Sequence, residues 1–140
     1  MNIFKSILNS LKVTPISVKI AKKIKMSDLH EQLTLFSQNK TEFDFIGIYS
    51  NGDDCLYFKK DGNQFNIEFE AVEKSHLSNF EKIKNFATKN NYAFTEEMNR
   101  DIPCLTIKMN TNIDQTVHVA RHIQNQIFGN NENTTYEIVP

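Results

Sequence analysis

The sequence has few of the residues that mark loop-dominated or disulfide-stapled proteins. Its 140 residues include no Trp, 2 Cys, 3 Pro and 4 Gly. Low Gly and Pro argue against a loop-rich fold, and two cysteines far apart in the chain do not make a disulfide framework. We therefore expect Cys55 and Cys104 to be buried free thiols in a reducing, cytoplasmic compartment.

Long apolar runs are also missing. No stretch approaches the length of a membrane-spanning helix, and lysines interrupt the apolar runs near the N-terminus, so we expect no secretory signal peptide. Hydrophobic residues make up 39% and charged residues 24% of the chain, as in an ordinary soluble globular protein. A chain of this length is expected to form one main domain.

Acidic residues are absent from the first 25 positions, which carry six lysines. The remaining residues hold 10 basic and 17 acidic side chains, a net charge of −7. This asymmetry divides the chain into a basic N-terminal arm, 1–25, and an acidic domain, 26–140. Phosphate is repelled by such a domain, so we expect no nucleic-acid partner.

The arm has the pattern of an amphipathic helix. Its apolar residues lie on one side and its polar residues on the other: Ile3, Phe4, Ile7, Leu8 and Leu11 against Lys5, Asn9 and Lys12. The arm can dock on its own domain, on a partner or on a membrane surface, and we favour intramolecular packing. The pattern of residues 16–26 fits a strand or a helix, and we favour a helix.

Residues 43–70 contain Asn51-Gly52 and Asp61-Gly62, which are strong hairpin signals. They predict three antiparallel strands at about 43–50, 54–60 and 63–70. With two-residue loops, Phe45 lies opposite Phe58, which lies opposite Phe65, and this Phe-rich side is buried. The acidic residues of the stretch do not match a calcium loop, because Phe65 stands at a ligand position and Asn66 at the required glycine.

The second face of these strands is then half-apolar. It carries Ile46, Ile48, Cys55 and Tyr57 together with Asn66 and Glu68. Such a surface needs a cover, either from the N-terminal helix or from another chain.

The other elements follow from periodicity and caps. Ser27 is expected to cap a helix with Leu29, Leu33 and Phe36 on its buried stripe, and Ser75 or Ser78 a second helix that ends at Asn90-Asn91. Two short strands follow, and then a helix from Asn112 to Phe128 that ends at Gly129. An edge strand is expected at about 134–139. The fold class is α+β, an antiparallel sheet of about five strands with helices packed on it.

No set of residues predicts catalysis. His118 and His122 have the i,i+4 spacing of a helical metal pair, but the Glu of metalloprotease helices is missing and both rings should face water. The sequence has no G-x-S-x-G elbow and no phosphate-binding glycine loop. We expect no catalytic residues, no metal and no cofactor.

From residue 27 onward the order is helix, three strands, helix, two strands, helix. This order, the acidic domain and the ending PCLTIKMNTNIDQTVHVARHIQNQIFG resemble the type III secretion chaperone-like fold, which includes class I secretion chaperones and the YbjN-type chaperone-like family. The resemblance covers about residues 27–129. It implies a homodimeric, non-catalytic module that holds an extended or partly unfolded polypeptide.

A half-apolar sheet with unpaired edges can accept such a segment. The candidate contact residues are Leu29, Leu33, Phe36, Ile46, Ile48 and Tyr57. Two alternatives stay open: an immunity or inhibitor protein that binds one partner through its acidic surface, and a small enzyme or metal-binding protein that uses Cys104 or the histidine pair.

Overall fold

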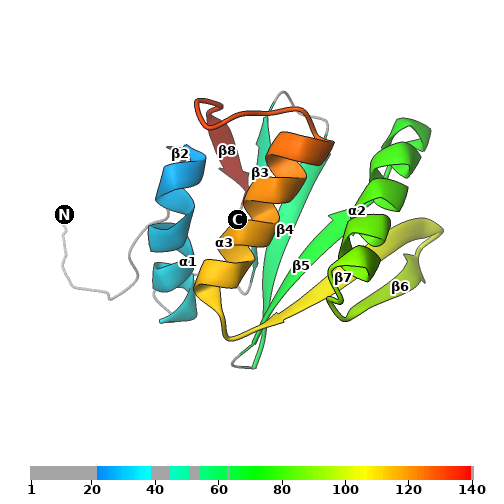
Figure 1. Ribbon diagram of the computed structural model, residues 1–140, viewed down its shortest axis with the longest axis horizontal. Helices are drawn as coiled ribbons and strands as arrows, with labels where there is room; N and C mark the ends of the chain where they lie inside the picture. Colours follow the sequence, from blue (N-terminus) through cyan, green and yellow to red (C-terminus); the bar gives the residue numbers. More distant parts are fainter. Residues whose placement is uncertain (1–21, 39–44, 51–53, 63, 140) are drawn as a thin grey trace, which may run out of the picture.

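The computed structural model describes residues 22–38, 45–50, 54–62 and 64–139. In this part of the chain a seven-stranded antiparallel sheet, in the order β2-β8-β3-β4-β5-β7-β6, is packed against helices α1, α2 and α3 (Figure 1). The strands are β2 Lys23–Ile24, β3 Phe45–Ser50, β4 Asp54–Asp61, β5 Gln64–Glu70, β6 Phe94–Asn99, β7 Ile102–Asn110 and β8 Tyr136–Val139. The helices are α1 Leu29–Ser37, α2 Leu77–Lys89 and α3 Ile113–His122, which η3 Ile123–Ile127 continues. The expected α+β class is confirmed.

The sheet has two strands more than the five expected, and both come from the ends of the described chain. The tail strand β8 was expected at an edge, but it pairs with β3 on one side and with β2 on the other. The short β2 takes the edge instead. Lys23–Ile24 is therefore strand rather than helix, whereas residues 16–21 lie outside the described part.

The first hairpin differs from its expected register. Ser50 pairs with Asp54, so three residues connect the strands, and Ile46 lies opposite Phe58. A shift of one residue moves every side chain of a strand to the other face. Ile46 and Ile48 are consequently 0% exposed, while Phe45 is 36% exposed. The prediction that Phe45 belongs to the core and the two isoleucines to the second face is wrong.

The second hairpin keeps its expected faces. Asp61 pairs with Gln64, and Gly62, with a φ of 65°, takes the left-handed conformation that the turn requires. The register differs by two residues from the expected one, so Phe58 lies opposite Ile67 instead of Phe65. Because an even shift preserves the faces, the Phe-rich side of β4 and β5 is buried as predicted, and Phe58 is 0% exposed.

The first two helix starts use caps other than those expected. Ser27 lies within the 3-10 turn that precedes α1, and Asp28 Oδ2 accepts a hydrogen bond of 3.0 Å from the Lys25 N–H. α2 begins after a second 3-10 turn, with His76 as its N-cap residue, so neither Ser75 nor Ser78 has the predicted role.

The start of α3 is as predicted. Asn112 Oδ1 accepts a hydrogen bond of 2.9 Å from the Gln115 N–H. The helix does not remain α-helical to Phe128: residues 123–127 form a π-helical turn, in which the Phe128 N–H donates to the Ile123 carbonyl at 2.9 Å. Gly129 follows with a φ of 82°.

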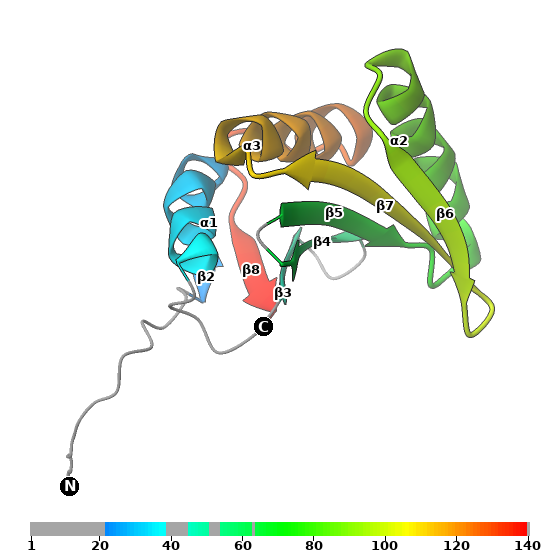
Figure 2. The same ribbon diagram turned by 90° about the horizontal axis from the view of Figure 1, so that it is seen from below.

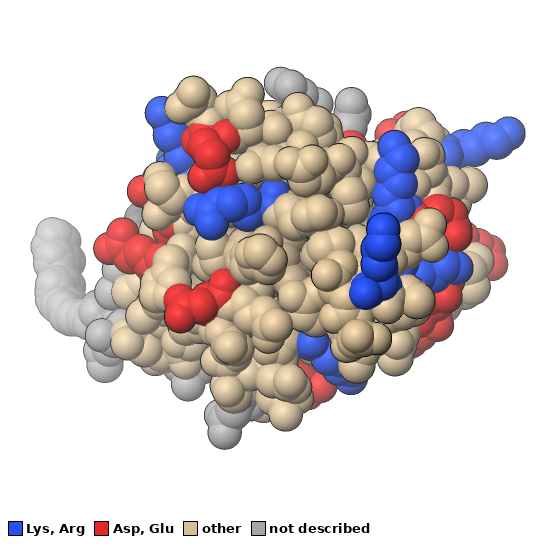
Figure 3. Space-filling model, viewed as in Figure 1, with Lys and Arg blue, Asp and Glu red and all other residues tan. Residues whose placement is uncertain are grey.

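All three α-helices lie on the same face of the sheet, and the core lies between them and the strands (Figure 2). α1 contributes Leu29, Leu33 and Phe36, each 0% exposed, to this core. On the helix-covered surface, basic and acidic side chains are interspersed, and neither sign forms a continuous patch (Figure 3). The opposite face of the sheet is where the remaining candidate surfaces lie.

Candidate protein-binding surfaces

The face of the sheet opposite the helices, here called the open face, is not covered by any described helix (Figure 2). The register divides it into two halves. Its apolar half, on β3, β4 and β8, consists of Phe45, Gly47, Tyr49, Cys55, Tyr57 and Val139. Its polar half lies on β5, β7 and β6 and includes Glu68, Glu70 and Glu97.

The apolar half is closely packed around Gly47. A Cβ atom at Gly47 would lie 2.9 Å from two ring carbons of Tyr57 and 2.9 Å from Cys55 Sγ. The Tyr57 ring therefore covers the Gly47 backbone. The Phe45 ring packs edge-on against the Tyr57 ring, with the two ring centroids 6.3 Å apart. A glycine within a strand often marks such a close approach, and this signal in FIGIY was missed in the sequence.

Burial raises the pKa of two titratable side chains in the apolar half, Cys55 and Tyr57. Burial raises the pKa of the Cys55 thiol to about 11, and Glu70 adds to the effect while a hydrogen bond with Tyr57 opposes it. The pKa of Tyr57 rises to about 12, first through burial and then through Cys55. Both groups are neutral near pH 7. Cys55 and Cys104 are free and half-buried, so the expectation that they are fully buried is wrong.

Cys55 should react slowly although it is partly exposed. At pH 8 we expect iodoacetamide to alkylate it about 100-fold more slowly than in the urea-unfolded chain, because the thiolate fraction falls about tenfold for each unit by which pH lies below the pKa. The rate should keep rising with pH toward about 11. Mass spectrometry of the peptide that contains Cys55 measures this rate separately from that of Cys104. A rate profile that levels off near pH 9 in the folded protein would contradict the assignment.

The polar half concentrates carboxylates. Cys104 of β7 lies between two of them: its cross-strand partner is Glu70 on β5 and Glu97 on β6. Burial raises the pKa of Glu68, Lys59 opposes this, and the charges of Glu70 and Glu97 raise it further. The acidic charge of the domain is therefore partly gathered on the open face.

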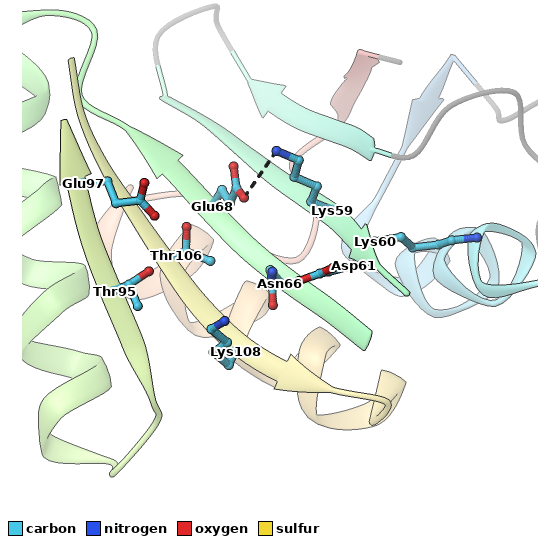
Figure 4. A pocket seen from close by; sticks show the side chains of 9 residues that line it. All are labelled: Lys59, Lys60, Asp61, Asn66, Glu68, Thr95, Glu97, Thr106 and Lys108. Atoms are coloured by element: carbon cyan, nitrogen blue, oxygen red, sulfur yellow. Dashed lines mark ion pairs between the residues drawn. The ribbon is translucent and has the colours of Figure 1, made fainter. Parts of the chain in front are cut away.

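A hollow of about 340 Å³ lies in the polar half (Figure 4). Two of its lining side chains form an ion pair, with Lys59 Nζ 3.8 Å from Glu68 Oε2. Its lining is Lys59, Lys60, Asp61, Asn66, Glu68, Thr95, Glu97, Thr106 and Lys108. These side chains carry both signs of charge.

The predicted contact residues divide sharply by exposure. Five of the six have no exposed surface: Leu29, Leu33, Phe36, Ile46 and Ile48 are each 0% exposed and belong to the core. These five side chains cannot contact a partner in this structure, because the core encloses them. Tyr57 is half-buried on the open face and remains available for contact.

The sheet offers a second surface at β6, here called the β6 edge. β6 is the last strand of the sheet and pairs with β7 alone among the described strands. Every residue from Thr95 to Asn99 is exposed, and Met98 is 65% exposed. Exposed strand edges carry unpaired N–H and C=O groups that can bond to another chain. No sequence motif marks an edge, because strand order is a property of the tertiary fold.

The two histidines of the pair lie in different environments. His118 is exposed as predicted, but His122 is half-buried and its ring stacks on Phe86 with centroids 4.0 Å apart, so only one of the two faces water. Burial lowers the pKa of His122, and the nearby His118 lowers it further. Within the described ranges, no group of three or more His, Cys, Asp and Glu side chains is placed to hold a metal ion.

The fold and its surfaces define a class only in architectural terms: an α+β domain with a one-sided helical layer. No helix of the described ranges combines the length and apolarity needed to cross a membrane. Comparison with models of protein families, with curated proteins and with solved structures finds no match for this chain.

Proposed function

We propose that the protein is a non-catalytic binding module that takes up an extended or partly unfolded polypeptide segment as an added strand on the β6 edge. The observation that carries the proposal is the exposed, singly paired β6 at the end of a seven-stranded sheet. Addition of a strand to such an edge obtains affinity from main-chain hydrogen bonds. The order of helices and strands from α1 to α3, which resembles that of secretion chaperones, supports the same class of function.

The backbone alternation of β6 identifies the groups that a partner would meet. The Lys108 N–H donates to the Ala93 carbonyl at 2.9 Å, and bonded residues alternate with non-bonded ones in an antiparallel pair. Phe94, Glu96 and Met98 therefore direct their N–H and C=O groups away from β7. They provide three donors and three acceptors for an added strand.

The side chains at this edge favour a basic segment with apolar residues. Glu96 and Glu97 place two adjacent carboxylates on β6, one on each face of the sheet. Glu96 Oε1 already lies 3.4 Å from Lys84 Nζ of α2, so Glu97 is the carboxylate that would attract a lysine of a partner strand. Both carboxylates would repel the same strand of a second copy. Met98, 65% exposed, supplies an apolar contact on the β6 edge.

A homodimer remains a prediction of the resemblance to secretion chaperones. The carboxylates of β6 argue that a dimer would form elsewhere than through two β6 edges. Sedimentation equilibrium of the 16.3 kDa chain tests this directly. A single species of twice that mass agrees with the dimer, and a strict monomer over the accessible concentration range contradicts it.

Peptides selected from a displayed random library provide the test of function. We expect enrichment of extended, lysine-containing peptides, and we expect Glu96→Pro to weaken their binding by at least about tenfold because it removes an outward N–H. Residue 96 makes no bond to β7 through that N–H, so the sheet itself should survive. Titration calorimetry measures the peptide affinity of wild type and of each variant.

Glu96→Ala is the matched control, since it removes the same side chain but keeps the N–H. Glu96→Ala should lose only the electrostatic part of the peptide affinity. The difference in affinity between this variant and wild type should therefore shrink as the salt concentration is raised. Equal affinity for wild type and Glu96→Pro, or failure to enrich any peptide, would count against strand addition at β6.

A further inference from the structure

We propose that the apolar half of the open face is a docking site for residues 1–21 of the protein's own N-terminal arm. This surface is separate from the main-chain edge of β6, and the inference does not depend on the proposed function. Residues 1–21 lie outside the described part of the chain, whereas residues 22–25 of the arm are described. The surface, the sequence of the arm and the point where the arm joins the sheet each support this docking.

The surface has the character of an interface rather than of ordinary exposed sheet. The Tyr57 ring lies on the Gly47 backbone, beside the Phe45 ring and Cys55 Sγ. Tyr49 lies opposite Cys55 and continues this group toward β8. Adjacent aromatic and aliphatic residues on a face that no described helix covers mark a site of contact more often than singly scattered ones do.

The arm has the complementary chemistry. Its apolar stripe includes Phe4 and Leu8, and the opposite side carries Lys5 and Lys12 without any acidic residue. On the open face the apolar half borders carboxylates, because Tyr57 on β4 lies opposite Glu68 on β5 and the charge of Glu70 acts on Cys55. A helix with its stripe on the apolar half can therefore place its ammonium groups near the carboxylates.

The arm joins the sheet at β2, the strand next to β8. Lys23 of β2 lies opposite Glu137 of β8, which lies opposite Tyr49 of β3. The arm thus joins the sheet in the row that contains Tyr49 and Cys55, and the Lys22 carbonyl accepts a hydrogen bond of 3.0 Å from the Ile138 N–H.

The length of the arm is sufficient. Three strand spacings separate β2 from β4, a distance of about 14 Å. A helix formed by residues 3–12 would be about 15 Å long, and residues 13–21 can span up to about 30 Å when extended. Because the arm is tethered beside its site, its effective concentration there is in the millimolar range. The tether favours the arm of the same chain over that of a second copy.

Zero-length carbodiimide cross-linking tests the proposal with the full chain. The reagent joins ammonium and carboxylate groups only where they are in contact. In an equal mixture of ordinary and ¹⁵N-labelled chains, we expect peptides in which Lys5 or Lys12 is joined to Glu68, Glu70 or Glu97, with both halves carrying the same label. Leu8→Gln should reduce their yield at least fivefold.

Asn9→Gln provides the control, because it introduces the same residue next to Leu8 but on the polar side of the arm. Its yield should stay within twofold of wild type, and circular dichroism should show that both variants keep the fold. Absence of these links, an equal yield in Leu8→Gln, or links only between differently labelled chains would overturn docking on the same chain. Glu96→Pro should leave the links unchanged, so the test is independent of strand addition at β6.

Discussion

Ile46→Asp is expected to unfold the protein. Ile46 is 0% exposed and lies opposite Phe58 in the centre of the core. The substitution removes a buried aliphatic side chain and places a carboxylate where no partner can reach it, a combined cost of about 5 kcal/mol or more. This is as large as the whole free energy of unfolding of many domains, about 5–15 kcal/mol. Circular dichroism and urea titration measure the loss.

Phe45→Asp is the matched control at the neighbouring position. Phe45 is 36% exposed on the open face, so the same carboxylate would remain in contact with water. We expect a loss of no more than about 2 kcal/mol, mainly from its contact with Tyr57. If Phe45→Asp unfolds the chain and Ile46→Asp does not, the register of the first hairpin is the one with the two-residue loop.

Tyr136→Ala should be the second most damaging change. Tyr136 is 0% exposed and lies in β8, opposite Ile24 of β2. Truncation of a fully buried aromatic side chain costs about 3–5 kcal/mol, because it combines lost transfer free energy with a cavity. The midpoint of urea unfolding should fall accordingly, with little change in slope.

Tyr136→Phe separates the packing of the ring from its hydroxyl. Within the described part of the chain the buried hydroxyl has no hydrogen-bond partner, and burial raises the pKa of Tyr136 to about 12, with Glu132 adding to the effect. Since an unpaired buried hydroxyl is costly, Tyr136→Phe should be at least as stable as wild type. A loss for Tyr136→Phe as large as for Tyr136→Ala would show that the hydroxyl is satisfied and carries the effect.

Local patterns predicted much of the fold because they act over a few residues. The Asn112 cap, the stripe of α1 and the glycine turn after β4 each depend on neighbours in the sequence. The register of the first hairpin could not be obtained in this way. Phe45 and Ile46 are both apolar, so composition allows either face, and a loop longer by one residue decides between them.

The candidate surface was less predictable than the fold. Leu29, Leu33 and Phe36 were assigned both to a buried stripe and to partner contacts, and their exposure of 0% is compatible only with the first. The β6 edge could not be inferred, because its exposure depends on which strand ends the sheet. Gly47 carried a local signal, since a glycine among apolar strand residues indicates that something packs on its backbone.

Hydrogen exchange at single-amide resolution tests strand addition on β6 most directly. With a library-selected peptide bound, we expect new protection at the amides of Phe94, Glu96 and Met98. Thr95 and Glu97 already bond to β7 and should change little. Protection confined to the helix-covered face or to the open face, with these three amides still exchanging at their free rates, would contradict binding at this edge.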